Sequence, residues 1–142
     1  MPTFLELAGA PVPDTVEGKS LLPLLRGETD GWREYYHGEH SPCYHPENAN
    51  QFLTDGRWKY IWNPINGEEQ LFQVVEDPDE CDELSADPTM ANMLAVWRQR
   101  MVEELAEREE GLSDGKKLIP GTVPVARSPI AEGVDAADVH LG

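Results

Sequence analysis

The chain has 142 residues, enough for one domain with a hydrophobic core, and its 27 acidic and 11 basic side chains give a net charge of −16. This charge argues against nucleic acid and anionic membranes as partners, because both would repel the protein. No apolar run approaches the roughly 20 residues of a transmembrane helix. The residues after Met1 do not show the basic region and apolar region of a signal peptide. These patterns leave the localisation open.

Two short helices are predicted near the N-terminus, over residues 2–8 and 21–25. Pro2 suits the first turn of a helix, because its missing amide hydrogen is not needed there. Ser20 can cap the second helix with its hydroxyl group. Residues 1–28 offer little cover for the apolar side chains of these helices, which are Phe4, Leu5, Leu7, Leu21, Leu22, Leu24 and Leu25. We therefore expect the chain to associate through these helices, since exposed apolar surface seeks a partner.

A sheet of antiparallel strands is predicted after Arg33, where aromatic and β-branched residues are interrupted by turn residues. The expected strands are residues 34–40, 51–54, 58–63 and 69–74. The Asp55-Gly56 pair is the clearest hairpin signal, and residues 64–67 form a second turn.

Three aromatic residues, Trp58, Tyr60 and Trp62, share one face of the third expected strand, because successive strand residues point to opposite sides. Such a row can stack a sugar or an aryl group. Opposite an amphipathic helix it is more typical of a hydrophobic core.

One long helix is predicted between Asp87 and Gly111. Asp87 can accept hydrogen bonds from the free amides of the first turn, and Pro88 fits the first helical position. Apolar side chains recur along one face at three- and four-residue spacing, at Met90, Met93, Leu94, Trp97, Met101 and Leu105. We expect this stripe to pack on the sheet. The predicted fold class is therefore α+β, a small four-stranded antiparallel sheet packed by one long C-terminal helix.

The chain is expected to have three segments. Residues 1–28 carry the short helices, and residues 29–111 form the subdomain of sheet and helix. Residues 112–142 are rich in Pro, Gly and Ala, and we expect them to be extended or disordered.

Residues 37–40, His-Gly-Glu-His, and the nearby Cys43 and His45 form the only cluster of metal-ligand residue types. Strand alternation places His37 and Glu39 on one face and His40 on the other, so the three side chains cannot reach one ion. We therefore expect no metal site. Both cysteines of the chain are expected to be free thiols, since two are too few for a disulfide framework.

Several segments carry a resemblance to a known family when their order and spacing are taken together. They are Met1–Gly9, Gly18–Gly27, Thr54–Ile61, Glu69–Phe72 and Glu76–Pro78 with Glu80. They resemble the C-terminal part of the type I sulfatases, arylsulfatase-like enzymes of the alkaline-phosphatase-like superfamily, over about residues 1–121. The resemblance implies that residues 1–28 end a larger α/β catalytic domain. It also implies a parent enzyme that hydrolyses a sulfate ester to an alcohol and sulfate.

The resemblance implies a nucleophile and a metal that this chain does not carry. In the family, a Cys or Ser in the pattern Cys/Ser-x-Pro-x-Arg becomes formylglycine, and the active site holds Ca²⁺. Cys43, Cys81 and the serines all fail this pattern. We therefore expect no catalytic residue, no metal ligand and no bound cofactor in this chain, and no activity of the chain alone. The alternative is a free-standing acidic module that reuses the fold to bind a protein partner.

The resemblance also implies a substrate contact, because in sulfatases the small C-terminal sheet lies beside the mouth of the active site. His37, His40 and the loop over residues 41–51 are then candidates for contacting the organic part of a sulfate ester. An imidazole can donate to an ester oxygen or a sugar hydroxyl. Lys59 is a candidate for a sulfate oxygen. The alternative is that His40 and Lys59 are surface residues without such a role.

Overall fold

The computed structural model describes residues 1–16, 18–40 and 45–122, and the chain divides into two compact units, Met1–Glu34 and Tyr35–Gly142. The division falls a little after residue 28, because Tyr35 already packs against the core of the second unit. Within the described ranges, no helix has both the length and the apolar composition to cross a membrane. Cys81 is an exposed free thiol, whereas Cys43 lies outside the described residues.

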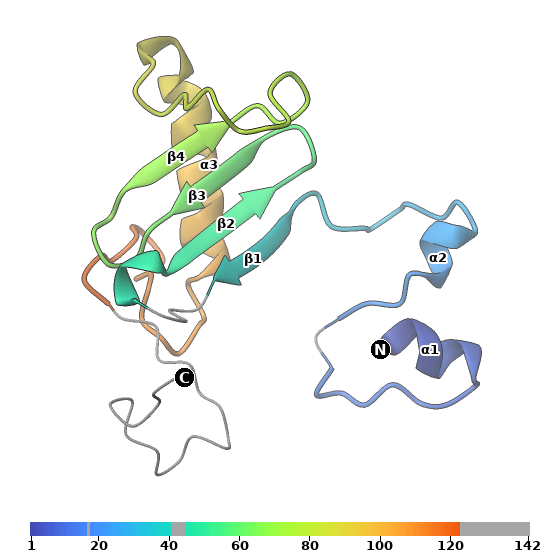
Figure 1. Cartoon of the computed structure of the whole chain (residues 1–142). Helices are drawn as coiled ribbons and strands as arrows, with labels where there is room; N and C mark the ends of the chain where they lie inside the picture. The colour runs from blue at the N-terminus through green and yellow to red at the C-terminus, as the bar shows by residue number, and fades with distance from the viewer. Residues whose placement is uncertain (17, 41–44, 123–142) are drawn as a thin grey trace, which may run out of the picture. The chain divides into compact units, whose positions relative to one another are not determined.

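The first unit contains both predicted N-terminal helices, α1 (Pro2–Leu7) and α2 (Leu22–Leu25) (Figure 1). The hydroxyl of Ser20 accepts a hydrogen bond from the amide of Leu22 at 3.2 Å, but Ser20 lies one residue before the N-cap, Leu21, so the predicted cap is not formed. A second hydroxyl, that of Thr3, accepts from the backbone just before α2 at 3.0 Å and ties the two helices together.

The first unit leaves its large apolar side chains open to solvent. The exposed fractions of Phe4, Leu7 and Leu25 are 76%, 64% and 77%. Two helices of six and four residues have too little surface to cover one another. The described residues of this unit, 1–16 and 18–34, therefore form no hydrophobic core.

The second unit is built on the predicted four-stranded antiparallel sheet. Its strands follow in chain order across the sheet, so that each pairs with the next, and a single helix crosses one face (Figure 1). The strands are β1 (Tyr36–His40), β2 (Asn50–Thr54), β3 (Lys59–Trp62) and β4 (Glu69–Phe72). A 3₁₀ turn, η1 (Pro46–Asn48), precedes β2. The predicted α+β class is confirmed.

The hairpin between β2 and β3 forms at the predicted Asp55-Gly56 pair, but with a longer loop than that pair alone makes. Thr54 pairs with Lys59, which leaves Trp58 in the loop. The carboxylate of Asp55 accepts hydrogen bonds from the amides two and three residues later, at 2.8 and 2.7 Å. Gly56 takes the left-handed backbone conformation, with φ of 85°, that the tight turn needs.

The hydrophobic core lies between the sheet and the helix α3 (Ala91–Glu104). Register places Leu53, Tyr60 and Leu71 in one row across the sheet on the face toward the helix. The core cluster is Leu53, Tyr60, Trp62, Leu71, Trp97, Met101, Leu105 and Leu112. The structure thus confirms that the aromatic row and the helix stripe are core, with the remaining predicted residues of both packed at its edge.

Helical structure begins after Asp87 as predicted, but its first residues form a 3₁₀ turn, so the α-helix is shorter than predicted at both ends. Asp87 accepts from the amide of Thr89 at 2.8 Å and caps a short 3₁₀ turn, η2 (Pro88–Met90), that leads into α3. The expectation that the helix continues to Gly111 is wrong, since α3 ends at Glu104. The hydroxyl of Ser113 donates to a carbonyl in the last turn at 2.8 Å, and this cap replaces further helical hydrogen bonds.

Within the second unit, residues 112–122 pack against the core and the turn between β3 and β4. Leu112 is fully buried in the core, and the amide of Ile119 donates back to its carbonyl at 2.9 Å. The amide of Gly121 donates to the carbonyl of Pro64, in the turn between β3 and β4, at 2.8 Å. The burial of Leu112 and the bond from Gly121 to Pro64 attach this stretch to the sheet and helix. The rest of the predicted tail, residues 123–142, lies outside the described residues.

Candidate functional site

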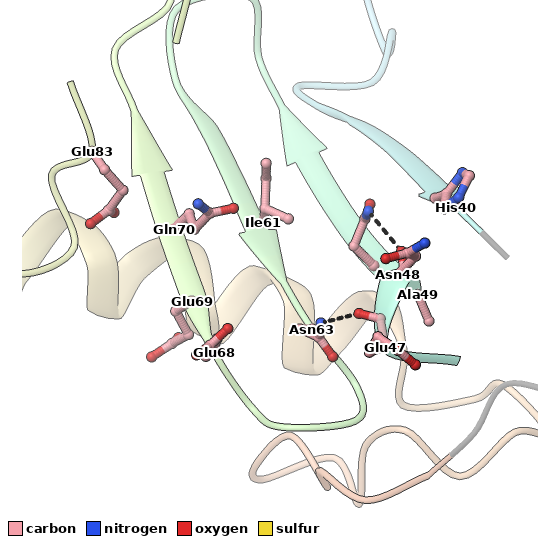
Figure 2. Close-up of a pocket in the computed structure, with 11 residues that line it drawn as sticks. His40, Glu47, Asn48, Ala49, Ile61, Asn63, Glu68, Glu69, Gln70 and Glu83 are labelled. Atoms are coloured by element: carbon pink, nitrogen blue, oxygen red, sulfur yellow. Dashed lines mark hydrogen bonds between the residues drawn. The ribbon is translucent and has the colours of Figure 1, made fainter. Parts of the chain in front are cut away.

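The face of the sheet that turns away from α3, called the outer face here, carries a hollow of about 830 Å³. Figure 2 shows its lining in front of the sheet, with α3 behind. The lining residues are His40, Glu47, Asn48, Ala49, Asn50, Ile61, Asn63, Glu68, Glu69, Gln70 and Glu83. They come from all four strands, from η1 and from the segment after β4.

Strand register brings the polar groups of the hollow together. His40, the last residue of β1, pairs with Asn50, the first residue of β2. Ile61 of β3 pairs with Phe52, two residues along β2 from Asn50, and with Gln70 of β4 at the far edge of the sheet, so these residues form the neighbouring row on the same face. Alternation along each strand keeps these side chains on the outer face, so an apolar floor at Ile61 is bordered by an imidazole and two amides (Figure 2).

Two asparagines hold the rim in place. The side chain of Asn63 donates to the carbonyl of Glu47 at 2.9 Å and accepts from the amide of Ile65 at 2.8 Å. It therefore links η1 to the turn between β3 and β4. Asn50 donates to the carbonyl of Asn48 at 3.4 Å. The rim is preorganised by the chain itself.

One carboxylate of the hollow is held ionised by the backbone. Glu83 accepts from the amide of Leu71 at 3.0 Å and from the amide of Ser85 at 2.6 Å. Partial burial alone would raise the pKa of Glu83, but these backbone hydrogen bonds outweigh it and lower the pKa below its usual value.

Glu69 is paired inside the chain. Its carboxylate accepts two hydrogen bonds from Arg98, both at 2.6 Å, and one from the hydroxyl of Tyr60 at 2.5 Å. Burial and the adjacent carboxylate raise the pKa of Tyr60 far above its ordinary value, so the phenol stays protonated and remains a donor. The charge of Glu69 is thus largely compensated.

The structure places only one of the three predicted substrate-contacting residues in the hollow, and that residue is His40. His37 lies on the helix side of the sheet, beside Leu53 in the register. Its Nε2 is 2.7 Å from the amide oxygen of the buried Gln51, and its Nδ1 is 3.6 Å from a carboxylate oxygen of Glu104. Alternation along β1 therefore separates the two histidines, as the sequence predicts.

Lys59 lies on the outer face but at the other end of the sheet. It pairs with Thr54, four residues along β2 from Asn50, which is roughly 13 Å at strand spacing. Its ammonium donates to both carboxylate oxygens of Glu80, at 2.8 and 2.7 Å, and sits 5.5 Å from the centre of the Phe52 ring. Its charge is compensated within the chain.

The sequence alone did not point to the polar residues that surround His40. Gln70 and Glu83 lie 30 and 43 residues after it in the chain, and neither belongs to a short motif. The pairing of all four strands had to be known before these residues could be placed together. In the described ranges, no group of three or more His, Cys, Asp or Glu side chains is arranged to hold a metal ion.

Comparison with known proteins gives a consistent set of relatives. Residues 1–108 match the family described as N-sulphoglucosamine sulphohydrolase, C-terminal. The chain is 38% identical over 121 residues to an arylsulfatase of Clostridium perfringens, covering 85% of this chain and 24% of that protein. It is 32% identical over 100 residues to a delta 4,5-hexuronate-2-O-sulfatase of Bacteroides thetaiotaomicron, covering 69% and 21%.

Solved structures agree with the sequence relatives. The chain superposes with a TM-score of 0.65 on a protein solved with its substrate D-glucosamine-2-N,6-O-disulfate. The two are 26% identical, and the match covers 82% of this chain and 25% of the other. The chain therefore spans about a quarter of the length of the relatives that it matches.

Proposed function

This chain belongs to the sulfatases of the alkaline-phosphatase-like superfamily and corresponds to their C-terminal part, and from this we propose that it is the non-catalytic part of a sulfate ester hydrolase. In this role the chain supplies no reacting group. It shapes the place where the organic part of the sulfate ester binds.

The proposal rests on one combined observation: the chain belongs to the sulfatase family, and its sequence lacks the motif that forms the catalytic formylglycine. The sequence holds no Cys/Ser-x-Pro-x-Arg pattern, and the chain covers only 24% of the arylsulfatase relative. The Ca²⁺ that the family implies does not fit the described side chains either. The nucleophile and the metal therefore have to come from residues other than these, and no chemical step is assigned to this chain.

The hollow on the outer face supports the second half of the proposal. Its volume of about 830 Å³ lies within the range of small-molecule sites, and a sugar ring fits easily. His40, Asn50 and Gln70 place an imidazole and two amides at its border. Such groups both donate to and accept from hydroxyls, which the alcohol product of a sulfate ester carries.

A chimera tests the proposal. The Clostridium perfringens arylsulfatase would receive this chain in place of its matching C-terminal quarter. We expect the chimera to hydrolyse a sulfate ester, and His40→Ala to raise KM about 3- to 10-fold with little change in kcat, because a lost contact to the organic group weakens binding. Gln99→Ala, on the exposed side of α3, is the matched control and should leave KM unchanged. A chimera that folds and turns over equally well with His40→Ala would refute the proposed contact.

The exposed apolar residues of the first unit add a proposal about assembly. Phe4 and Leu25 are each more than three quarters exposed, and we propose that they pack on another surface. In a complete sulfatase this surface would belong to the catalytic domain. The same residues also fit the alternative of a free-standing module with a protein partner. The chimera separates these possibilities, because a free-standing protein-binding module would not restore the sulfatase activity of the chimera.

We expect the isolated chain to self-associate as the salt concentration rises. The net charge of −16 opposes association, but at physiological salt it is screened beyond about 8 Å, so that apolar contact prevails. Sedimentation velocity across a salt series measures the effect. Combining Phe4→Ser with Leu25→Ser should keep the chain monomeric, whereas Val75→Ser, at a 60% exposed apolar residue of the second unit, should not. A wild-type chain that is monomeric at every salt concentration would contradict this expectation.

A further inference from the structure

The charged side chains that line the hollow are predominantly acidic. Among the described residues that line it there are four glutamates and one histidine, and there is no lysine or arginine. A site that binds sulfate groups is normally rich in arginine or lysine and poor in carboxylates, because guanidinium and ammonium groups bind oxyanions.

The four carboxylates do not contribute equally to the negative charge of the hollow. Glu69 is compensated by Arg98 through two hydrogen bonds. Glu83 is kept ionised by backbone amides, which carry no net charge to cancel it. Among the described residues, the one ion-pair partner of Glu47 is the imidazole of His45, 3.8 Å away, and Glu68 is exposed on the turn before β4. Three of the four lining glutamates thus have no lysine or arginine partner among the described residues.

From this lining we propose that the hollow accepts an uncharged or amine-bearing organic group and rejects one that carries a further carboxylate or sulfate. The inference rests on the proposed function, in which the hollow holds the organic part of the sulfate ester. It names the substrate class of that site.

Hydroxyl groups suit the lining for a direct reason. A carboxylate accepts hydrogen bonds from hydroxyls and from ammonium groups, and it cannot donate one to an anion. His40, Asn50 and Gln70 supply the complementary donors at the border of the hollow. A neutral sugar can therefore satisfy every group it meets there.

An added negative charge meets repulsion at each of the three carboxylates. At roughly 7 Å, one pair of like charges weakens binding by about 3-fold in a water-like dielectric and by about 50-fold in the dielectric near a protein surface. Even one such pair gives a measurable preference. Two of the relatives are named for molecules that carry such extra charges, a hexuronate and a disulfate, whereas a third is named for N-acetylglucosamine, which carries none. Selection against such charges would distinguish this chain from the first two proteins.

The test uses the full chain and three sugars that share one ring, namely glucose, glucosamine and glucuronate. Amide shifts in an NMR titration report both affinity and location. We expect glucose and glucosamine to shift the amides of Asn50 and Gln70, and glucuronate to bind at least about 10-fold more weakly.

Charge reversal at one position sharpens the test. Glu68→Lys should strengthen glucuronate binding at least about 3-fold relative to glucose binding. Glu68→Gln should act in the same direction with a smaller effect. Glu76→Lys is the matched control, because it changes the net charge equally at an exposed residue that does not line the hollow.

The outcomes distinguish a failure of the charge selection from a failure of the proposed function of the hollow. Glucuronate that binds the wild-type chain as tightly as glucose overturns the charge selection and leaves the hollow as a sugar site. An equal gain from Glu76→Lys and Glu68→Lys also overturns it, since the whole-chain charge would then be the cause. If none of the sugars shifts the amides of the hollow, the proposed function of the hollow fails, and the inference fails with it.

Discussion

Replacing Trp97 by alanine is expected to lower the free energy of unfolding by about 3 to 5 kcal/mol, the usual cost of removing a buried tryptophan. Trp97 is fully buried at the centre of the core between α3 and the sheet. The ring of Tyr35 meets it edge to face, with centroids 6.3 Å apart, and the guanidinium of Arg100 lies 4.6 Å from the ring centroid. The indole nitrogen has no hydrogen-bond partner among the described residues, so the expected loss is almost entirely one of packing.

Urea unfolding followed by circular dichroism measures this loss. In a domain of ordinary stability, about 5 to 15 kcal/mol, a loss of that size removes a large fraction of the total. Val96→Ala is the matched control, because Val96 precedes Trp97 on α3 and is 49% exposed. It should change the free energy of unfolding by no more than about 0.5 kcal/mol. Equal effects of the two substitutions would show that the helix does not pack through Trp97.

The chain alone is expected to give no turnover of an aryl sulfate, with or without added Ca²⁺. Enzymes accelerate such reactions by about 10⁶-fold or more, and they need a positioned nucleophile and electrostatic stabilisation to do so. The sequence carries no residue in the pattern that forms formylglycine. Binding groups on one sheet face cannot replace that nucleophile.

A continuous assay with a chromogenic aryl sulfate checks this expectation, and the arylsulfatase chimera serves as the positive control. The chain should be expressed in a host that matures sulfatases and purified by two independent routes. Turnover that follows the amount of chain through both routes would contradict the prediction, because contaminating sulfatase would not follow it.

The fold was largely predictable because its elements follow simple periodic rules. Alternation in Trp58, Tyr60 and Trp62 predicts a buried strand face, and the three- and four-residue spacing around Trp97 predicts the helix that covers it. The end of that helix was not predictable. The bond from Ser113 to the carbonyl of Val102 joins residues that no local pattern relates.

The candidate site was less predictable than the fold, because its residues meet only through strand pairing. Alternation correctly separated His37 from His40. It could not reveal that Glu80, 21 residues away, holds Lys59. It also could not reveal that Gln70 and Glu83 face the same hollow as His40. Ion pairs and pockets of this kind depend on contacts between distant parts of the chain.

The bond between Gly121 and Pro64 has a consequence for synthesis on the ribosome. It joins the turn after β3 to a segment made more than fifty residues later, and Leu112 completes the core on the way. The four strands can pair as soon as they leave the exit tunnel, yet the nascent sheet keeps one side uncovered until α3 and residues 112–121 have followed. Until then, the strands present an apolar face to chaperones and to neighbouring nascent chains, and this interval is when the protein is most open to misassembly.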